Sequence, residues 1–278
     1  MEQEIITQPQ LGHLLELMTE LGSIADNLVL VGGQAARLLN LTKRGTKDFD
    51  FVLNVVALRE ITQPISDTLT KLGYQVVQES RMFQFYKQIS VTPDQQIRLE
   101  FLASEKEKRP KKDDFRVDVQ EDLHARACAG AEIALNESDF ILLSGVLPNG
   151  KTATAKIRLI RPYALLMLKL FAMDDRYRNI RGPKEARHDR EEARIHTDDI
   201  IRIVRHQIQN PDFKGLFWSQ FSREQELEKR SRNIISEYFA DLNAPGIQLY
   251  REFLQAQGTG NIDEAEVERA LREMRLLL

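Results

Sequence analysis

The chain has 278 residues, 42% of them hydrophobic, which is enough for a sizeable core in one large or two small domains. Its 39 basic and 42 acidic side chains give a net charge of −3, so bulk charge neither requires nor excludes a nucleic-acid partner. A single cysteine, Cys128, excludes an intramolecular disulfide framework and a multi-cysteine zinc site.

The N-terminal ten residues are polar and acidic, unlike a signal peptide, and no apolar run approaches the ~20 residues that span a bilayer. We therefore expect a cytoplasmic protein. The first 157 residues then alternate helical and strand-like patterns, which predicts an α+β domain with a mixed sheet and flanking helices. Helices are expected at Leu14–Leu21, Gln34–Leu41 and Leu58–Leu72, the last of them interrupted or started by Pro64. Strands are expected at Leu28–Val31, Phe49–Val52, Tyr74–Val77, Met82–Tyr86 and Ile97–Leu102, with weaker signals at Glu132–Leu135 and Phe140–Leu143.

Residues 158–278 have a different character and are expected to form a separate helical domain. Pro162 suits the first turn of a helix whose apolar face begins at Leu165. Further helices are expected at Glu191–Gln209, Arg223–Phe239, Ile247–Ala256 and Glu264–Leu278. The charged stretch Glu105–Asp114 in the first domain is expected to be an exposed loop.

The chemically informative segment begins where the strand Leu28–Val31 ends in Gly32 and Gly33 and a helix follows at once. Glycine allows close backbone approach, and the amides at a helix N-terminus can bind a phosphate. By itself this pattern is more typical of an ordinary turn.

Asp48 and Asp50 follow on a predicted strand, where residues i and i+2 point to the same face. The two carboxylates therefore lie side by side, with Phe49 directed into the core. Their mutual repulsion is relieved by a divalent cation, and Mg²⁺ prefers carboxylate oxygens. An ordinary exposed strand face is the alternative, because this spacing often occurs by chance.

Glu100 offers a third carboxylate on a separate strand, opposite the apolar face of Ile97, Leu99 and Phe101. Pairing of that strand with Phe49–Val52 would complete a triad suited to two-metal phosphoryl transfer. The alternative is a solvated strand glutamate.

Taken together, these features resemble the nucleotidyltransferase superfamily of the DNA polymerase β type, and most closely its AbiEii-type branch, which includes toxins of toxin–antitoxin systems. The residues that match the branch's first motif are Gly32, Gly33, Arg44, Thr46, Asp48 and Asp50. A second match is the helical motif of Lys169, Ala172 and Arg176. Glu100 stands where the family more commonly has aspartate.

The resemblance implies a nucleotidyltransferase that moves a nucleoside monophosphate from an NTP such as ATP to an acceptor hydroxyl with Mg²⁺ or Mn²⁺. Asp48, Asp50 and Glu100 would be metal ligands and, with Lys169, catalytic residues. The nucleotide would be bound by Gly32, Gly33, Arg44, Thr46, Lys169 and Arg176. The alternative for Lys169 is a lysine that flanks an apolar stripe.

The acceptor implied by the resemblance is RNA, such as a tRNA 3′ end, or a protein, and a cognate antitoxin would be a partner. A small-molecule acceptor, as in antibiotic-modifying members, and a catalytically inactive binding module are the alternatives. Asp199 either orients Lys169 or Arg176 or lies with Asp198 on an exposed helix face. His196 as a base and Cys128 as a nucleophile are weaker candidates than their structural interpretations.

Overall fold

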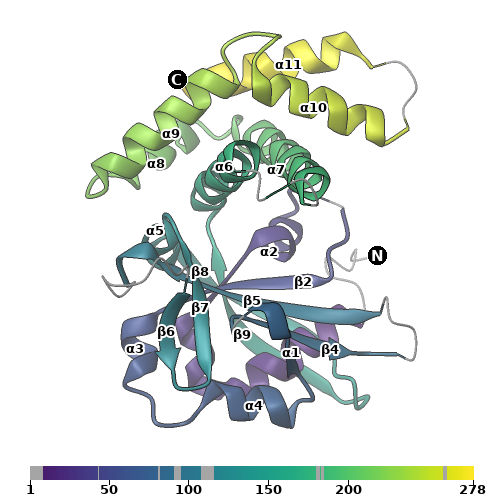
Figure 1. Cartoon of the computed structure of the whole chain (residues 1–278), viewed down its shortest axis with the longest axis vertical. Coiled ribbons are helices and arrows are strands. Elements are labelled where there is room, and N and C mark those ends of the chain that lie inside the picture. The colour runs from purple at the N-terminus through teal and green to yellow at the C-terminus, as the bar shows by residue number, and fades with distance from the viewer. Residues whose placement is uncertain are drawn as a thin grey trace. The chain divides into compact units, whose positions relative to one another are not determined.

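The computed structural model describes residues 9–42, 44–80, 82–90, 95–107, 116–179, 182, 185–258 and 262–278. The chain divides into two compact units, Met1–Arg161 and Pro162–Leu278. The first is an α+β unit built on a mixed sheet, and the second is helical (Figure 1). The boundary expected at 157/158 falls inside strand β9, Thr152–Ile160, so the sheet unit continues to the end of that strand.

The sheet has the strand order β3-β4-β5-β2-β1-β9-β8, with β7 paired to both β5 and β6. Its other strands are β1 Leu28–Val31, β2 Asp48–Leu53, β3 Gln75–Val76, β4 Gln84–Gln88, β5 Gln96–Ser104, β6 Arg116–Gln120, β7 Leu123–Cys128 and β8 Ser138–Val146. The pairs β1/β9, β2/β5 and β5/β7 are parallel and the remaining pairs are antiparallel. The Glu100 strand does pair beside β2, which is the condition that the carboxylate triad requires.

The core of this unit follows from the alternation of apolar residues in the central strands. All four residues of β1 are buried, as expected for a strand covered on both faces. In β2 the buried side chains include Phe49 and Phe51, and in β5 they include Leu99 and Phe101. The Phe101 ring lies 6.2 Å from Phe51, centroid to centroid. The polar residues between them therefore face away from this core.

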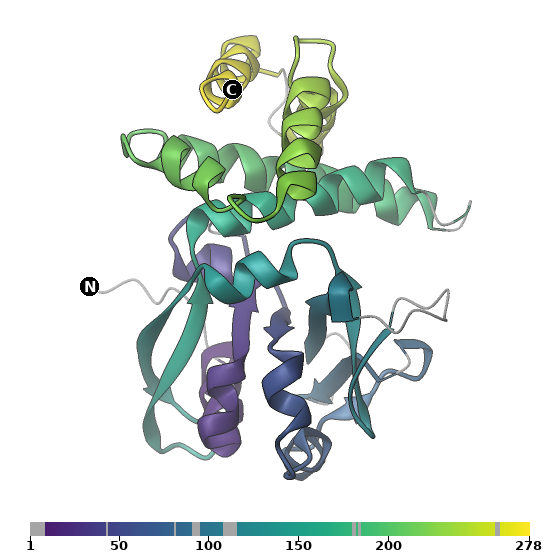
Figure 2. The ribbon, with the colours of Figure 1, turned by 90° about the vertical axis from the view of Figure 1, so that its left-hand side faces the viewer.

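Helices cover the sheet at several places: α1 Gln10–Leu21, α2 Gly32–Leu38, α3 Val55–Arg59, α4 Ile65–Lys71 and α5 Ala131–Asn136. α1 lies against the β8–β9 hairpin (Figure 2), where Leu11 and Leu15 fill the space beside Gly145.

One expected element is divided as Pro64 suggested, and one was wrong. The helix expected at 58–72 is two short helices: α3 ends at Arg59, and α4 begins directly after the extended backbone of Pro64. The strand expected at 132–135 is the helix α5, which follows Gly130 in the left-handed region at φ 81° and buries Ile133 and Ala134.

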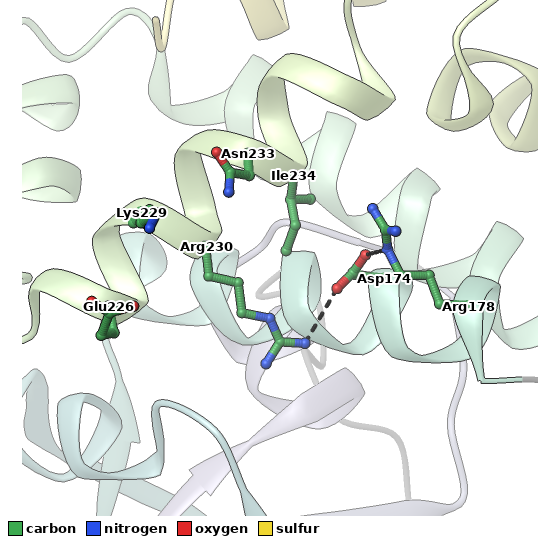
Figure 3. Close-up of a pocket in the computed structure, with 7 residues that line it drawn as sticks. All are labelled: Asp174, Arg178, Glu226, Lys229, Arg230, Asn233 and Ile234. Carbon is green, nitrogen blue, oxygen red and sulfur yellow. Dashed lines mark hydrogen bonds and ion pairs between the residues drawn. The ribbon is translucent and has the colours of Figure 1, made fainter.

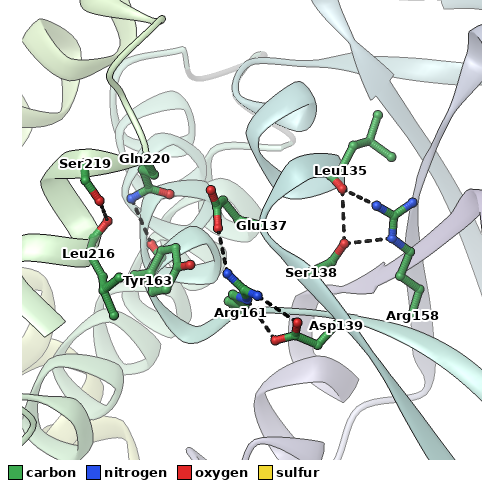
Figure 4. Close-up of polar contacts among 10 residues, drawn as sticks. All are labelled: Leu135, Glu137, Ser138, Asp139, Arg158, Arg161, Tyr163, Leu216, Ser219 and Gln220. Atoms are coloured by element: carbon green, nitrogen blue, oxygen red, sulfur yellow. Dashed lines mark hydrogen bonds and ion pairs between the residues drawn. The ribbon is translucent and has the colours of Figure 1, made fainter. Parts of the chain in front are cut away.

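Polar contacts join the segments around the start of β8 (Figure 4). Arg158 on β9 donates to the Ser138 hydroxyl at 2.8 Å and to the Leu135 carbonyl at 2.5 Å. Arg161 pairs with Asp139 at 2.8 Å. The end of β9 is therefore fastened to α5 and β8.

The second unit consists of α6 Pro162–Arg178, α7 Ala186–Gln207, α8 Phe213–Ser219, α9 Gln225–Tyr238, α10 Pro245–Ala256 and α11 Glu264–Arg275. α6 packs against α7, α8 and α9, and α7 packs against α10 and α11. Trp218 of α8 donates its indole N–H to the carbonyl of Leu277 at 2.8 Å, and Gln220 donates to the Tyr163 carbonyl at 3.4 Å (Figure 4). Trp218 thus joins α8 to the last residues of the chain. Within the described ranges, no helix combines the length and the apolar character that crossing a bilayer requires.

Replacement of Phe101 by alanine should lower the free energy of unfolding by about 3–5 kcal/mol, because it leaves a cavity against Phe51 and Phe85. Phe140→Ala is the control, since half of that side chain is exposed, and it should cost no more than about 1 kcal/mol. Urea titrations followed by far-UV circular dichroism measure both. Equal transition midpoints for the two variants would contradict this description of the core.

Candidate active site

Asp48 and Asp50 are the first and third residues of strand β2. Asp50 pairs with Val31, the residue directly before Gly32 and Gly33. Asp48 is exposed and Asp50 is half-buried, while Phe49 between them is fully buried. The predicted placement of the two carboxylates on the face away from the core is therefore confirmed. β2 lies between β1 and β5, so residues of both neighbouring strands border the pair.

Gly32 lies directly against the Asp50 carboxylate. The last residue of β1, Val31, is the register partner of Asp50, and the chain turns at Gly32 with φ at +68°. A Cβ atom at Gly32 would lie 1.8 Å from Asp50 Oδ2. Only glycine can occupy this position without displacing the carboxylate, which explains the first residue of the glycine pair.

The loop before β2 is packed onto the second glycine. A Cβ atom at Gly33 would lie 2.9 Å from Thr46 Cγ2. The Gln34 side chain, which is fully buried, donates from Nε2 to the Thr46 carbonyl at 2.8 Å. Thr46 Oγ1 in turn accepts from the Asp48 backbone N–H at 3.3 Å. These contacts bring Gly33, Thr46 and Asp48 together, and Gln34 is a positioning residue that sequence reasoning missed.

Arg44 is held on the same loop, half-buried, with its backbone N–H donating to Thr42 Oγ1 at 3.1 Å. The predicted turn at 43–45 lies in part outside the described residues, because Lys43 is not among them. α2 follows Gly32 at once and packs against β2 (Figure 1).

Glu100 is the register partner of Asp50 in the parallel β2/β5 pair, so its backbone is adjacent to the aspartates. Its carboxylate is engaged by two other strands. Gln84 Nε2 donates to Glu100 Oε2 at 3.0 Å, and Arg126 Nε lies 2.7 Å from Oε1. The cause is topological: β4 pairs with β5 up to Glu100, and β7 takes over that edge from Leu102.

No three acidic, histidine or cysteine side chains of the described residues are grouped so as to hold a metal ion. The role of Glu100 as a third metal ligand therefore stays a prediction. It requires the carboxylate to turn from Arg126 toward the aspartate pair.

A cavity of about 310 Å³ borders Asp48 and is lined by Lys47, Gln96 and Arg98 as well. With the Gln96 amide oriented so that its oxygen faces Arg98, that oxygen accepts from Nε at 2.8 Å and from Nη2 at 2.6 Å. Arg98 is the register partner of Asp48, which is why a cation stands beside the first aspartate. Sequence reasoning missed these lining residues, although the i, i+2 spacing of Arg98 and Glu100 could have indicated Arg98.

Lys169 and Arg176 belong to the helical unit, where each is paired to an aspartate of α7. Lys169 Nζ lies 2.7 Å from Asp199 Oδ2, and both side chains are buried. Arg176 Nη1 lies 2.8 Å from Asp189 Oδ1. The suggestion that Asp199 orients Lys169 is confirmed. The alternative, in which Asp198 and Asp199 are exposed, was wrong, because both are buried where α7 packs against the rest of its unit.

The surroundings of the two weaker candidates, Cys128 and His196, favour a structural role for each side chain. Burial raises the pKa of the Cys128 thiol to about 11, which favours the protonated thiol over the nucleophilic thiolate at neutral pH. His196 is largely buried, with Nε2 4.0 Å from Glu192.

No protein-family model matches this sequence, and no curated protein matches it either. The functional assignment therefore depends on the motif and on the geometry described above.

Gly32→Ala should lower the free energy of unfolding by about 1–3 kcal/mol and weaken Mg²⁺ binding, because the new methyl group displaces the Asp50 carboxylate. Gly45→Ala is the matched control, since a Cβ there meets nothing within 4 Å, and its effect should stay within about 0.5 kcal/mol. Urea unfolding and isothermal titration with Mg²⁺ measure the two effects. Unchanged stability and metal binding in Gly32→Ala would refute the close approach.

Lys169→Met should cost about 3–5 kcal/mol, because it leaves the Asp199 carboxylate buried without its cation. The double variant Lys169→Met/Asp199→Leu should be less destabilised than the sum of the two single changes, by about 0.5–3 kcal/mol. Arg187→Met removes an exposed pair with Glu191 and serves as the control, within about 0.5 kcal/mol. Strict additivity in the urea-derived free energies would show that the buried pair is not coupled.

Proposed function

We propose that this protein is a metal-dependent nucleotidyltransferase, which transfers a nucleoside monophosphate from an NTP to an acceptor hydroxyl and releases pyrophosphate. The observation that supports this most strongly is the contact between Gly32 and the Asp50 carboxylate. It places an acidic pair and a glycine turn, two features far apart in the sequence, against each other. Acidic residues that hold a cation beside a backbone able to approach phosphate are what phosphoryl transfer requires.

The residues present fit Mg²⁺, or Mn²⁺ in its place. Mg²⁺ is usually held by one or two carboxylates and completes its shell with water and substrate phosphates. Asp48 and Asp50 share one strand face, and Asp48 is open to solvent. The bound cation would neutralise charge on the transferring phosphoryl group. Two aspartates are sufficient for this, so the proposal does not depend on Glu100 as a ligand.

The reaction is a substitution at the α-phosphorus: the acceptor oxygen forms the new P–O bond while the bond to pyrophosphate breaks. Gly32 and Gly33 would admit the triphosphate close to the backbone, and Arg44 and Thr46 would orient it. The acceptor hydroxyl must lose a proton to a carboxylate or to water, and Glu100 is the candidate base. Arg126 and Gln84 each contact one oxygen of that carboxylate and so limit its movement.

Lys169 and Arg176 would contribute positive charge to the triphosphate. Asp199 and Asp189 limit the freedom of these side chains, since each aspartate holds its cation in one rotamer. A charged hydrogen bond of this kind positions a phosphate-binding cation before the ligand arrives. Contact with the nucleotide is proposed on the family resemblance, and the two ion pairs support a positioned cation.

The proposed acceptor is RNA, such as a tRNA 3′ end, or a protein, with the reaction in the cytoplasm and a cognate antitoxin as partner. The toxin role follows from the resemblance. A small-molecule acceptor is the enzymatic alternative. One observation favours the non-enzymatic alternative of a binding module: the Glu100 carboxylate is already occupied by Arg126 and Gln84.

The test is label transfer from each α-³²P-labelled NTP, with Mg²⁺ or Mn²⁺, to total tRNA and to a protein extract. Asp48→Asn and Asp50→Asn should each reduce transfer by about 10²-fold or more, because the cation loses a ligand. Asp122→Asn, an exposed aspartate in the β6–β7 turn, should retain wild-type transfer.

Calorimetric titration with Mg²⁺ and NTP separates the alternatives. Nucleotide binding that needs both aspartates but is followed by no transfer would favour the binding module. Transfer that survives in Asp48→Asn and Asp50→Asn would contradict the proposed site.

A further inference from the structure

The helical unit contains a cavity of about 250 Å³ between α6 and α9, and its walls are mostly charged (Figure 3). The lining residues are Asp174, Arg178, Glu226, Lys229, Arg230, Asn233 and Ile234. None of them is part of the nucleotidyltransferase motifs. Three of the seven are cations, and they come from two different helices.

A buried carboxylate organises this cavity. Asp174 is only 8% exposed, and in Figure 3 it lies between Arg178 and Arg230. Asp174 Oδ1 accepts from Arg178 Nε at 2.6 Å and from the Tyr238 hydroxyl at 3.0 Å. Asp174 Oδ2 accepts from Arg230 Nη2 at 3.3 Å. One carboxylate therefore holds two guanidinium groups in place at the cavity wall.

The Arg230 guanidinium is positioned by a second contact, because its central carbon lies 4.5 Å from the centroid of the Phe171 ring. The hydrogen bonds to Asp174 do not use all the N–H donors of Arg178 and Arg230. Among the described residues, Arg178 uses Nε for Asp174 and Nη2 for Glu237, which leaves Nη1, and Arg230 uses only Nη2. An arginine carries five N–H donors, so both side chains keep donors for a further acceptor.

α9 adds two more donor side chains on the same face. Lys229 and Asn233 are four residues apart, so they are neighbours on the helix. Both are exposed, and neither side chain has a partner among the residues that the structure describes. Glu226 lies one turn before Lys229 and is the one lining carboxylate without a cation partner among the described residues.

We propose that this cavity is a binding site for the phosphate group of a sugar phosphate. Arginine, lysine and amide donors that converge on one cavity match the oxygens of a phosphate. Glu226 can accept a hydrogen bond from a neighbouring sugar hydroxyl. The volume lies just below the usual range for ligand sites, about 300–1,000 Å³, so it suits a phosphate and a sugar but not a large ligand. A free nucleotide and the backbone of an RNA strand both provide this group.

The test is equilibrium binding of three probes to the full chain without Mg²⁺: inorganic phosphate, a ribonucleoside monophosphate and a short single-stranded RNA. Lys229→Gln and Arg230→Gln should each weaken binding about tenfold, because each removes one charged hydrogen bond. Lys214→Gln, an exposed lysine on α8, is the matched control and should bind as the wild type does. Asp48→Asn should also bind normally, which separates this site from the proposed catalytic one.

The probe that binds most tightly identifies the source of the phosphate group. Tightest binding of RNA, weakened by salt, indicates a strand backbone, and equal binding of the monophosphate indicates a free nucleotide. Thermal unfolding of Lys229→Gln provides the second measurement, and its midpoint should match the wild type because this lysine has no partner in the part of the chain that the structure describes. Absence of saturable binding by all three probes, or binding that Lys229→Gln and Arg230→Gln leave unchanged, would overturn the proposal and leave the cluster as a brace between α6 and α9.

Discussion

The contact between the Gly32 backbone and the Asp50 carboxylate is the constraint on which the sheet unit's candidate site depends. It arises because Val31 and Asp50 are register partners, so the turn that follows β1 must pass directly over the second aspartate. A side chain at Gly32 would lie 1.8 Å from the carboxylate oxygen. The buried strand β1 holds the turn in place. The hydrogen bond between Gln34 and Thr46 holds the loop that precedes β2 against this turn. The glycine pair and the aspartates of the sequence motif thus lie against each other in the folded unit.

The helical unit uses buried aspartates in a different way. Asp199, Asp189 and Asp174 each accept from basic side chains, and each is less than a tenth exposed. Burial of such charges is favourable only where every carboxylate has a cation or donor within hydrogen-bond reach. These aspartates therefore determine where the basic side chains of α6 and α9 point. The two cations of the second motif, Lys169 and Arg176, pair with the two most buried of these aspartates.

Much of this arrangement can be predicted from local sequence patterns. The alternation of apolar and polar residues in β5 correctly places Leu99 and Phe101 on the opposite face from Glu100. The apolar run of β1 predicts that strand with its observed bounds. The failures have physical causes. No strand was expected at β9, because its threonine, alanine and lysine residues give only a weak alternation of apolar and polar positions. A strand was expected at α5, because a helix of six residues shows little periodicity. The partners of Glu100 come from β4 and β7, and only the tertiary register brings them to it. The Gly32–Asp50 contact is equally non-local, although its two motifs are visible in the sequence.

A crystal of the full chain soaked with Mn²⁺ and a non-hydrolysable NTP tests the central claim most directly, because anomalous scattering locates the metal without assumptions about the acceptor. The account predicts a peak at coordination distance, about 2.0–2.3 Å, from carboxylate oxygens of both Asp48 and Asp50, with the triphosphate beside Gly32 and Gly33. A peak bound elsewhere, or a nucleotide ordered away from the glycine turn, would contradict it.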